Sequence, residues 1–204
     1  IMYADLDGDG KISNGTNKLG DTGDYRIIGN STPRFKYGIT LDAAWKGFDF
    51  SIFMQGIGKR DLWLDGCYFW GANGQGNEWQ STGFAEHWDF FRPEGDPLGA
   101  NLNSYYPRVN FSGDRNTKVQ TRYLQNGAYL RLKNVQLGYT LPRVWTEKAG
   151  ISSVRVYVSG DNLATITSLS KIFDPEATGS LAGTGSGKLY PLQRVISVGV
   201  NVNF

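Results

Sequence analysis

The residues best suited to bind a ligand lie near the start of the chain, where acidic side chains alternate with other residues. Asp5, Asp7 and Asp9 occupy alternate positions, followed by Gly10 and Lys11. This spacing matches the first half of an EF-hand-type loop, in which carboxylate oxygens and the carbonyl at the seventh position converge on Ca²⁺. The segment therefore predicts a cluster of hard oxygen ligands.

The motif departs from the EF-hand pattern at its last ligand. Thr16 stands at the twelfth position, where a bidentate Glu is expected, so Asp21 or Asp24 would have to complete the site. The predicted structural calcium site consists of Asp5, Asp7, Asp9, Lys11 and Asp21. The alternative is an exposed loop rich in Asp and Gly that holds no metal. No other cofactor is expected.

Aromatic residues are concentrated in a second polar segment, residues 59–125. It contains four of the six tryptophans, Trp63, Trp70, Trp79 and Trp88. Exposed aromatic faces suit stacking on sugars or contact with a protein. Packing of the segment against itself is the simpler role for most of these side chains. Contact of the four tryptophans, Trp63, Trp70, Trp79 and Trp88, with a ligand or a partner protein is the functional alternative.

The residues of this chain do not form a recognisable catalytic motif, and no enzymatic activity is predicted. The single histidine, His87, has no nucleophile or metal-ligand motif around it. A glycoside hydrolase would need two carboxylates about 5–9.5 Å apart, and the sequence fixes no such pair. The acidic residues that could be imagined in that role are Glu78, Glu86, Asp89 and Glu94.

Composition excludes several classes of protein. The 204 residues carry 21 Lys and Arg against 19 Asp and Glu, so binding to nucleic acid is not expected. A single cysteine, Cys67, excludes a disulfide scaffold. No apolar run approaches the roughly 18 residues of a membrane-spanning helix. These averages describe a soluble β-protein, but they do not detect membrane β-barrels, whose strands alternate between apolar and polar residues.

Alternation of apolar and polar residues predicts five antiparallel strands. Their approximate ranges are 37–45, 48–54, 128–141, 154–160 and 196–204. The third changes phase near Lys133 and Asn134, which predicts a β-bulge there. Including flanking residues, the strands run to about 9–14 residues, and spanning a bilayer takes about 9–11. We therefore expect membrane strands, with a soluble glycan-binding β-sandwich as the alternative.

The predicted fold is all-β, with the C-terminal antiparallel strands of a large transmembrane β-barrel and long extracellular loops. Residues 1–33 are an extracellular loop, 34–58 a hairpin of the barrel, and 59–125 a long extracellular loop with a short helix near 81–91. Residues 126–204 hold the last three strands and an extracellular loop at 165–189. Five strands cannot close a barrel, because about eight are needed. We therefore expect the chain to be a piece of a longer protein.

The two faces of these strands differ in polarity. The residues expected to face lipid include positions 37, 39, 41, 196, 198, 200 and 202. The residues expected to face the lumen are Thr40, Asp42, Asp49, Ser51, Gln55, Arg155, Tyr157, Ser159, Ser197 and Asn201.

A series of short motifs resembles one family. The motifs are DLDGDGKI at 5–12, IGNSTPRFKYG at 28–38, KGFD at 46–49, NGAYLRLKNVQLGYTLP at 126–142, VYVSGDNL at 156–163, FDPE at 173–176 and GVNVNF at 199–204. In this order they resemble the C-terminal part of SusC/RagA-type TonB-linked outer-membrane transporters.

The resemblance implies a barrel of about 22 strands with an N-terminal plug, in the bacterial outer membrane. It implies energy from the TonB complex through a region that this chain lacks. It also implies a SusD-like surface lipoprotein that captures glycan oligosaccharides or peptides, and a dimer of transporter–lipoprotein units. Phe204 resembles the terminal aromatic residue that signals barrel assembly.

Overall fold

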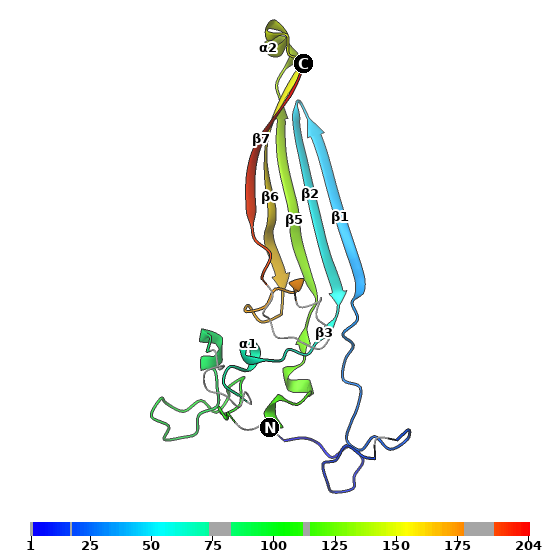
Figure 1. The fold of residues 1–204 in the computed structure, drawn as a ribbon, viewed down its shortest axis with the longest axis vertical. Helices are drawn as coiled ribbons and strands as arrows, with labels where there is room; N and C mark the ends of the chain where they lie inside the picture. Colours follow the sequence, from blue (N-terminus) through cyan, green and yellow to red (C-terminus); the bar gives the residue numbers. More distant parts are fainter. Residues whose placement is uncertain (1, 17, 74–82, 112–114, 178–189) are drawn as a thin grey trace. The chain divides into compact units, whose positions relative to one another are not determined.

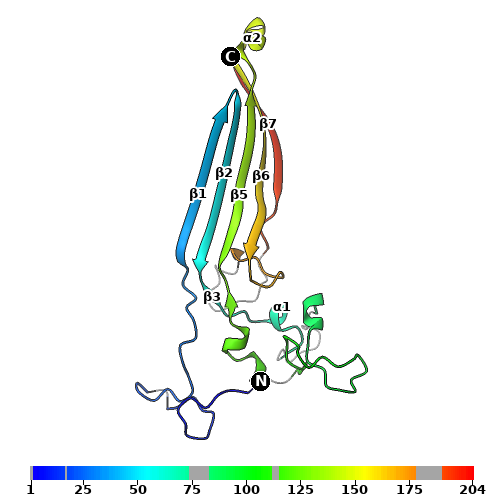
Figure 2. The same cartoon turned by 180° about the vertical axis from the view of Figure 1, so that it is seen from behind.

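The structure is a computed structural model that describes residues 2–16, 18–73, 83–111, 115–177 and 190–204. Its main feature is a sheet of five antiparallel strands in the order β1-β2-β5-β6-β7 (Figures 1 and 2). These strands are β1 (Arg34–Trp45), β2 (Phe48–Lys59), β5 (Tyr129–Thr140), β6 (Ser153–Thr167) and β7 (Val195–Asn203). All five predicted strands are therefore confirmed, and several are longer than the alternation alone indicated.

The remaining elements are short. A two-stranded sheet pairs β3 (Asp61–Leu62) with β4 (Gln125–Asn126). The helices are α1 (Cys67–Trp70), α2 (Arg143–Thr146) and the 3₁₀ turns η2 (Ala85–Trp88), η3 (Arg115–Thr117), η4 (Thr121–Tyr123) and η5 (Glu147–Ala149). The helix expected near residues 81–91 is thus the single turn η2. None of the described helices is both long and apolar enough to cross a membrane.

The connections at one end of the sheet are tight. Lys46 and Gly47 join β1 to β2 with φ angles of 48° and 87°. Positive φ at both central residues is what a type I′ hairpin turn requires. The same end of the sheet carries α2 and η5, which link β5 to β6 (Figure 1).

The predicted bulge lies at the predicted place. Phe53 of β2 pairs with Asn134 and the next residue, Met54, pairs with Leu132, so β5 holds Lys133 as an extra residue. The register between β5 and β6 shifts at the same point. There Asn162 adopts a left-handed backbone with φ 52°, a conformation that Asn tolerates better than most residues. The bulge reverses which side chains of β5 point to each face of the sheet.

The chain divides into two compact units. One comprises residues 1–29 and 63–124, and the other contains the sheet, with residues 30–62 and the described residues from 125 onward. The first unit has an aromatic core in which Phe69, Trp70, Tyr106 and Tyr123 are at most 2% exposed. The Trp70 and Tyr123 rings meet edge to face with their centroids 4.7 Å apart. Such pairs add specificity to the burial of aromatic surface.

Candidate functional site

One face of the five-stranded sheet is apolar. A row of directly paired residues crosses all five strands on this face: Ala43, Phe50, Leu137, Val158 and Val198. These side chains are exposed, and Val198 keeps 76% of its surface and Leu137 46%. In a β-sandwich a second sheet would cover this face. The part of the chain that the structure describes contains no such sheet, so the sandwich alternative receives no support from it.

The opposite face of the sheet is polar next to this apolar row. The neighbouring row of paired residues is Asp42, Ser51, Gln136, Ser159 and Ser197. Two adjacent rows of opposite polarity fit a wall with lipid on one side and an aqueous, protein-filled lumen on the other. The division between the two faces predicted from the alternation is present in the register.

An ion pair lies flat on the polar face. The Arg155 guanidinium of β6 bonds to both carboxylate oxygens of Asp49 in β2, across the intervening strand β5. Gly138 of β5 leaves room for this, because a Cβ there would lie 2.5 Å from both Arg155 Nη2 and Asp49 Oδ2. The Arg155 guanidinium also lies 5.0 Å from the centre of the Tyr157 ring. The pair therefore ties three strands together on the face that carries the polar row.

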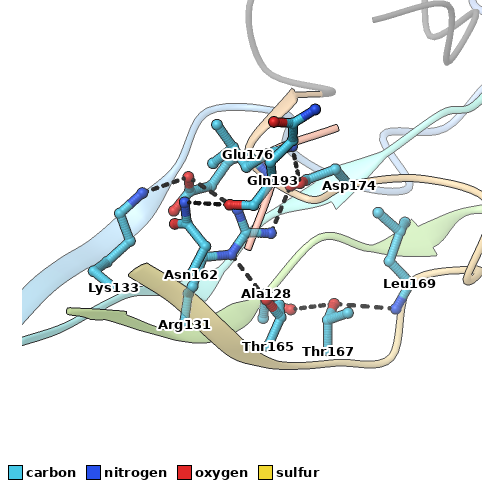
Figure 3. Close-up of polar contacts among 11 residues, drawn as sticks. Ala128, Arg131, Lys133, Asn162, Thr165, Thr167, Leu169, Asp174, Glu176 and Gln193 are labelled. Carbon is cyan, nitrogen blue, oxygen red and sulfur yellow. Dashed lines mark hydrogen bonds and ion pairs between the residues drawn. The ribbon is translucent and has the colours of Figure 1, made fainter. Parts of the chain in front are cut away.

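A second charged cluster, the rim cluster, consists of Arg131, Lys133, Asp174 and Glu176 (Figure 3). Arg131 bonds to Asp174 at 2.7 Å and to Glu176 at 3.2 Å, and Lys133 bonds to Glu176 at 3.0 Å. The sequence left the facing of Arg131 and Lys133 undecided and paired neither residue with the acidic ones. Two features of the sequence could have indicated these ion pairs: the predicted bulge beside Arg131 and the acidic residues of the FDPE motif at 173–176.

The acidic residues near the start of the chain converge only in part. Carboxylate oxygens of Asp5, Asp7 and Asp24 lie within 4.8 Å of one another. Asp5 accepts hydrogen bonds from the backbone N–H groups of Gly8 at 2.6 Å and Gly10 at 2.8 Å. These bonds wrap the chain around Asp5, as an EF-hand-type loop would. Three carboxylates in one place suit a divalent cation.

Electrostatics in this loop reflects the crowding of like charges. Hydrogen bonds from the backbone N–H groups of Leu6 and Ser13 lower the pKa of Asp24. For Asp7 a bond from the Asp9 N–H lowers the pKa. Desolvation and the neighbouring carboxylates outweigh that bond and raise it overall. A cation would relieve this repulsion.

The other predicted calcium ligands, Asp9 and Asp21, are not part of the group formed by Asp5, Asp7 and Asp24. The Asp9 carboxylate accepts a bond from the Lys11 N–H at 2.7 Å. Asp21 accepts bonds from the hydroxyl of Thr16 at 2.6 Å and from its N–H at 3.0 Å. These bonds lower the pKa of Asp21. Asp24, and not Asp21, is the later carboxylate that the fold brings beside Asp5. Calcium binding stays a prediction.

The tryptophans of the long segment occupy different environments. Trp70 is buried at 2% exposure, and Trp63 is half-buried with its ring centroid 5.9 Å from that of Trp70. Trp88 is 60% exposed, and the Arg92 guanidinium lies 5.4 Å from the centre of its ring. Trp79 lies outside the described residues. Packing thus accounts for Trp70, and the prediction of an external contact now rests mainly on Trp88.

His87 has a structural environment. Its Nδ1 accepts a hydrogen bond from the Phe84 N–H at 3.0 Å, and its Nε2 lies 3.0 Å from the Phe69 carbonyl, to which it donates. Both ring nitrogens are therefore engaged by backbone groups, which leaves neither for proton transfer to a substrate. The terminal Phe204 is 90% exposed. Its role as an assembly signal stays a prediction.

Comparison with known proteins identifies relatives along the whole chain. TonB-dependent receptor P3 of Formosa agariphila is 33% identical over an alignment 213 positions long, which covers 100% of this chain and 19% of the receptor. TonB-dependent receptor P26 of the same organism is 29% identical and covers 99% of this chain and 19% of the receptor. The chain thus spans about a fifth of the length of these relatives. No family model matches it.

Solved structures that resemble this chain also belong to an outer-membrane importer. The RagAB peptide importer in its open-open state matches 90% of this chain and 19% of its own, with a TM-score of 0.66 and 28% identity. The closed-closed state of the same importer matches 96% of this chain and 20% of its own, with a TM-score of 0.64 and 26% identity. These relatives are receptors and importers, which are not enzymes, in agreement with the prediction of no enzymatic activity.

The comparisons and the fold agree with each other. The apolar and polar faces of the sheet have the polarity of a barrel wall, and the relatives are proteins of the bacterial outer membrane. The matched region lies at the C-terminal end of the relatives. The family resemblance drawn from the sequence is thereby confirmed, and the chain is the counterpart of the C-terminal barrel portion of SusC/RagA-type TonB-linked outer-membrane transporters.

Proposed function

We propose that the complete protein imports nutrients across the outer membrane and that this chain supplies five neighbouring strands of its barrel. The observation that carries the proposal is the pair of rows that cross the sheet, one apolar and one polar. A sheet with these two faces separates lipid from a lumen, and it performs no covalent chemistry. Its relatives TonB-dependent receptor P3 and the RagAB importer support transport as the purpose of that lumen.

We further propose that the importer works with a SusD-like surface lipoprotein and takes peptides or glycan oligosaccharides as cargo. The RagAB matches are to a peptide importer, which supports the peptide class. Energy comes from the TonB complex, which engages the periplasmic side of the complete protein, and a plug fills the lumen against the polar row. Two transporter–lipoprotein units associate as a dimer.

An uptake experiment separates the two classes of cargo. Cells that carry the complete transporter are given fluorescently labelled peptides or labelled oligosaccharides, and the label inside the cell is measured with and without TonB. TonB-dependent accumulation of one class supports import and names the cargo. Equal accumulation in cells that lack the transporter would contradict the proposal.

Purification tests the partner independently. The tagged transporter is extracted from the outer membrane in mild detergent, and its composition is measured by native mass spectrometry. We expect one lipoprotein for each transporter and two such units in the assembly. A transporter that purifies alone, while uptake remains intact, would contradict the lipoprotein proposal and leave the import proposal standing.

A further inference from the structure

The rim cluster joins parts of the chain that lie far apart in the sequence. We propose that Arg131 is a positioning residue that holds both ends of the connection between β6 and β7 against the sheet (Figure 3). The outgoing end is residues 168–177, and the returning end is residues 190–194. This assignment concerns the sheet itself and does not depend on the cargo or the partner.

The bulge in β5 sets which face of the sheet Arg131 points to. After the bulge along the chain, Asn134 and Gln136 lie on the polar face. Before the bulge, Leu132 pairs with Met54 on the apolar face. If the strand alternated regularly through Lys133, with no bulge, Arg131 would have the same parity as Val135 and Leu137 and would face the apolar side. A charged side chain exposed to lipid is costly, so the bulge turns Arg131 toward the polar face and leaves the two flanking leucines on the apolar one.

Arg131 uses its whole guanidinium. Its side chain is 5% exposed, and its Nε–H donates to Thr165 Oγ1 at 2.8 Å. One terminal nitrogen donates to Asp174 at 2.7 Å and the other to Glu176 at 3.2 Å. The planar fork of Arg suits such simultaneous contacts, which the point charge of Lys cannot reproduce. Arg131 therefore links β6 to the outgoing end of the connection.

Asp174 extends this link to the returning end. One of its oxygens accepts bonds from Arg131 and from the Glu176 N–H, and the other accepts a bond from the Leu192 N–H at 3.1 Å. A single carboxylate thus joins both ends of the connection. Next to it the amide of Asn162, at the bulged position of β6, donates to the Gln193 carbonyl at 3.0 Å.

Charge balance explains why Arg131 is the central member. The rim cluster contains two cations and two anions, and the side chain of Asp174 is 8% exposed. Removing one partner of a buried ion pair leaves the other charge uncompensated, and this costs more than the net value of the pair. Loss of Arg131 leaves Asp174 without its cation in the rim cluster and Glu176 with Lys133 alone, so both ends of the connection should loosen at once.

Hydrogen exchange of the complete transporter in detergent tests this role. We compare Arg131→Gln with Arg155→Gln, the same substitution in the other ion pair of the same sheet. We expect exchange at the Glu176 and Leu192 amides to rise roughly tenfold or more in Arg131→Gln and to stay unchanged in Arg155→Gln. Unchanged protection at Leu192 in a folded Arg131→Gln variant would overturn the proposal, because Asp174 would then hold the two ends alone.

A second variant keeps the test decisive if Arg131→Gln does not fold, which heat-modifiable mobility on a gel reveals. Asp174→Asn lies in the connection and preserves the shape of the side chain. It should loosen the Leu192 amide to a similar degree, and unchanged protection at Leu192 in this variant would overturn the proposal. Where Arg131→Gln does fold, the double variant should exchange no faster than the more severe single one, and additive effects would overturn the proposal because the two residues would then act separately.

Discussion

Placing a charge on the apolar face tests whether that face contacts lipid. We consider Val198→Lys, because Val198 is 76% exposed and lies within β7 with three strand residues before it and five after it. Nine residues at about 3.3 Å each, tilted by about 40°, span about 23 Å along the membrane normal, close to the apolar band of about 25 Å. Val198 therefore lies near the middle of the bilayer.

The expected cost follows from that depth. A Lys on the lipid face of a barrel near the midplane costs about 2–4 kcal/mol, which lowers the folding equilibrium constant roughly 30- to 700-fold. The matched control is Ser197→Lys, at nearly the same depth on the polar face. Because that side chain points to the lumen, we expect the control to change stability by less than about 1 kcal/mol.

The assay is a urea titration of the complete transporter refolded into phosphatidylcholine vesicles, followed by tryptophan fluorescence. The midpoint should fall for Val198→Lys and remain near that of the unmodified protein for Ser197→Lys. Equal losses for both variants, or no loss for Val198→Lys, would refute the assignment of the two faces.

Three further predictions follow from local geometry. Gly199→Val should cost about 1–3 kcal/mol by urea unfolding, because a Cβ there would lie 2.4 Å from the Tyr157 ring, and Tyr157→Ala in the same chain should recover part of the loss. The pKa of Asp174 is lowered, since bonds from Arg131 and backbone N–H groups outweigh the effect of burial. Its contribution to stability should therefore be complete above the ordinary carboxyl pKa and disappear as pH falls through the lower folded value, which thermal unfolding at decreasing pH would show. A stability that is flat through that range would contradict it. If the N-terminal loop binds Ca²⁺, Asp24→Asn should weaken binding in calorimetry at least tenfold and Asp21→Asn much less, and the reverse order would favour the ligand set predicted from sequence.

Patterns within a single strand could be predicted from the sequence. The alternation in β7 set its two faces, and the change of phase at Lys133 located the bulge, because both depend on residues adjacent in the chain. The alternation of apolar and polar residues could not predict that β1 begins at Arg34. Arg34, Phe35 and Lys36 break the alternation, and pairing with β2 extends the strand through them. Tertiary pairing overrides local pattern at such ends.

Contacts between distant segments could not be predicted. Arg131 and Asp174 are 43 residues apart, and nothing in either local sequence specifies the other. The choice of Asp24 over Asp21 likewise depends on how the loop turns back on itself, through bonds from Leu6 and Ser13. The sequence supplied the candidates in both cases, and the geometry of loop closure selected among them.

Lipid on one face of the five strands and a lumen on the other is what makes them a barrel wall. Spin labels placed one at a time at positions 39, 41, 196, 198 and 200, and at the intervening positions 40, 42, 197 and 201, measure it directly in the complete transporter in a bilayer. We expect the first set to be accessible to oxygen and shielded from a water-soluble nickel reagent, and the second set to show no such lipid exposure. Access of the nickel reagent to positions 196, 198 and 200 would contradict it.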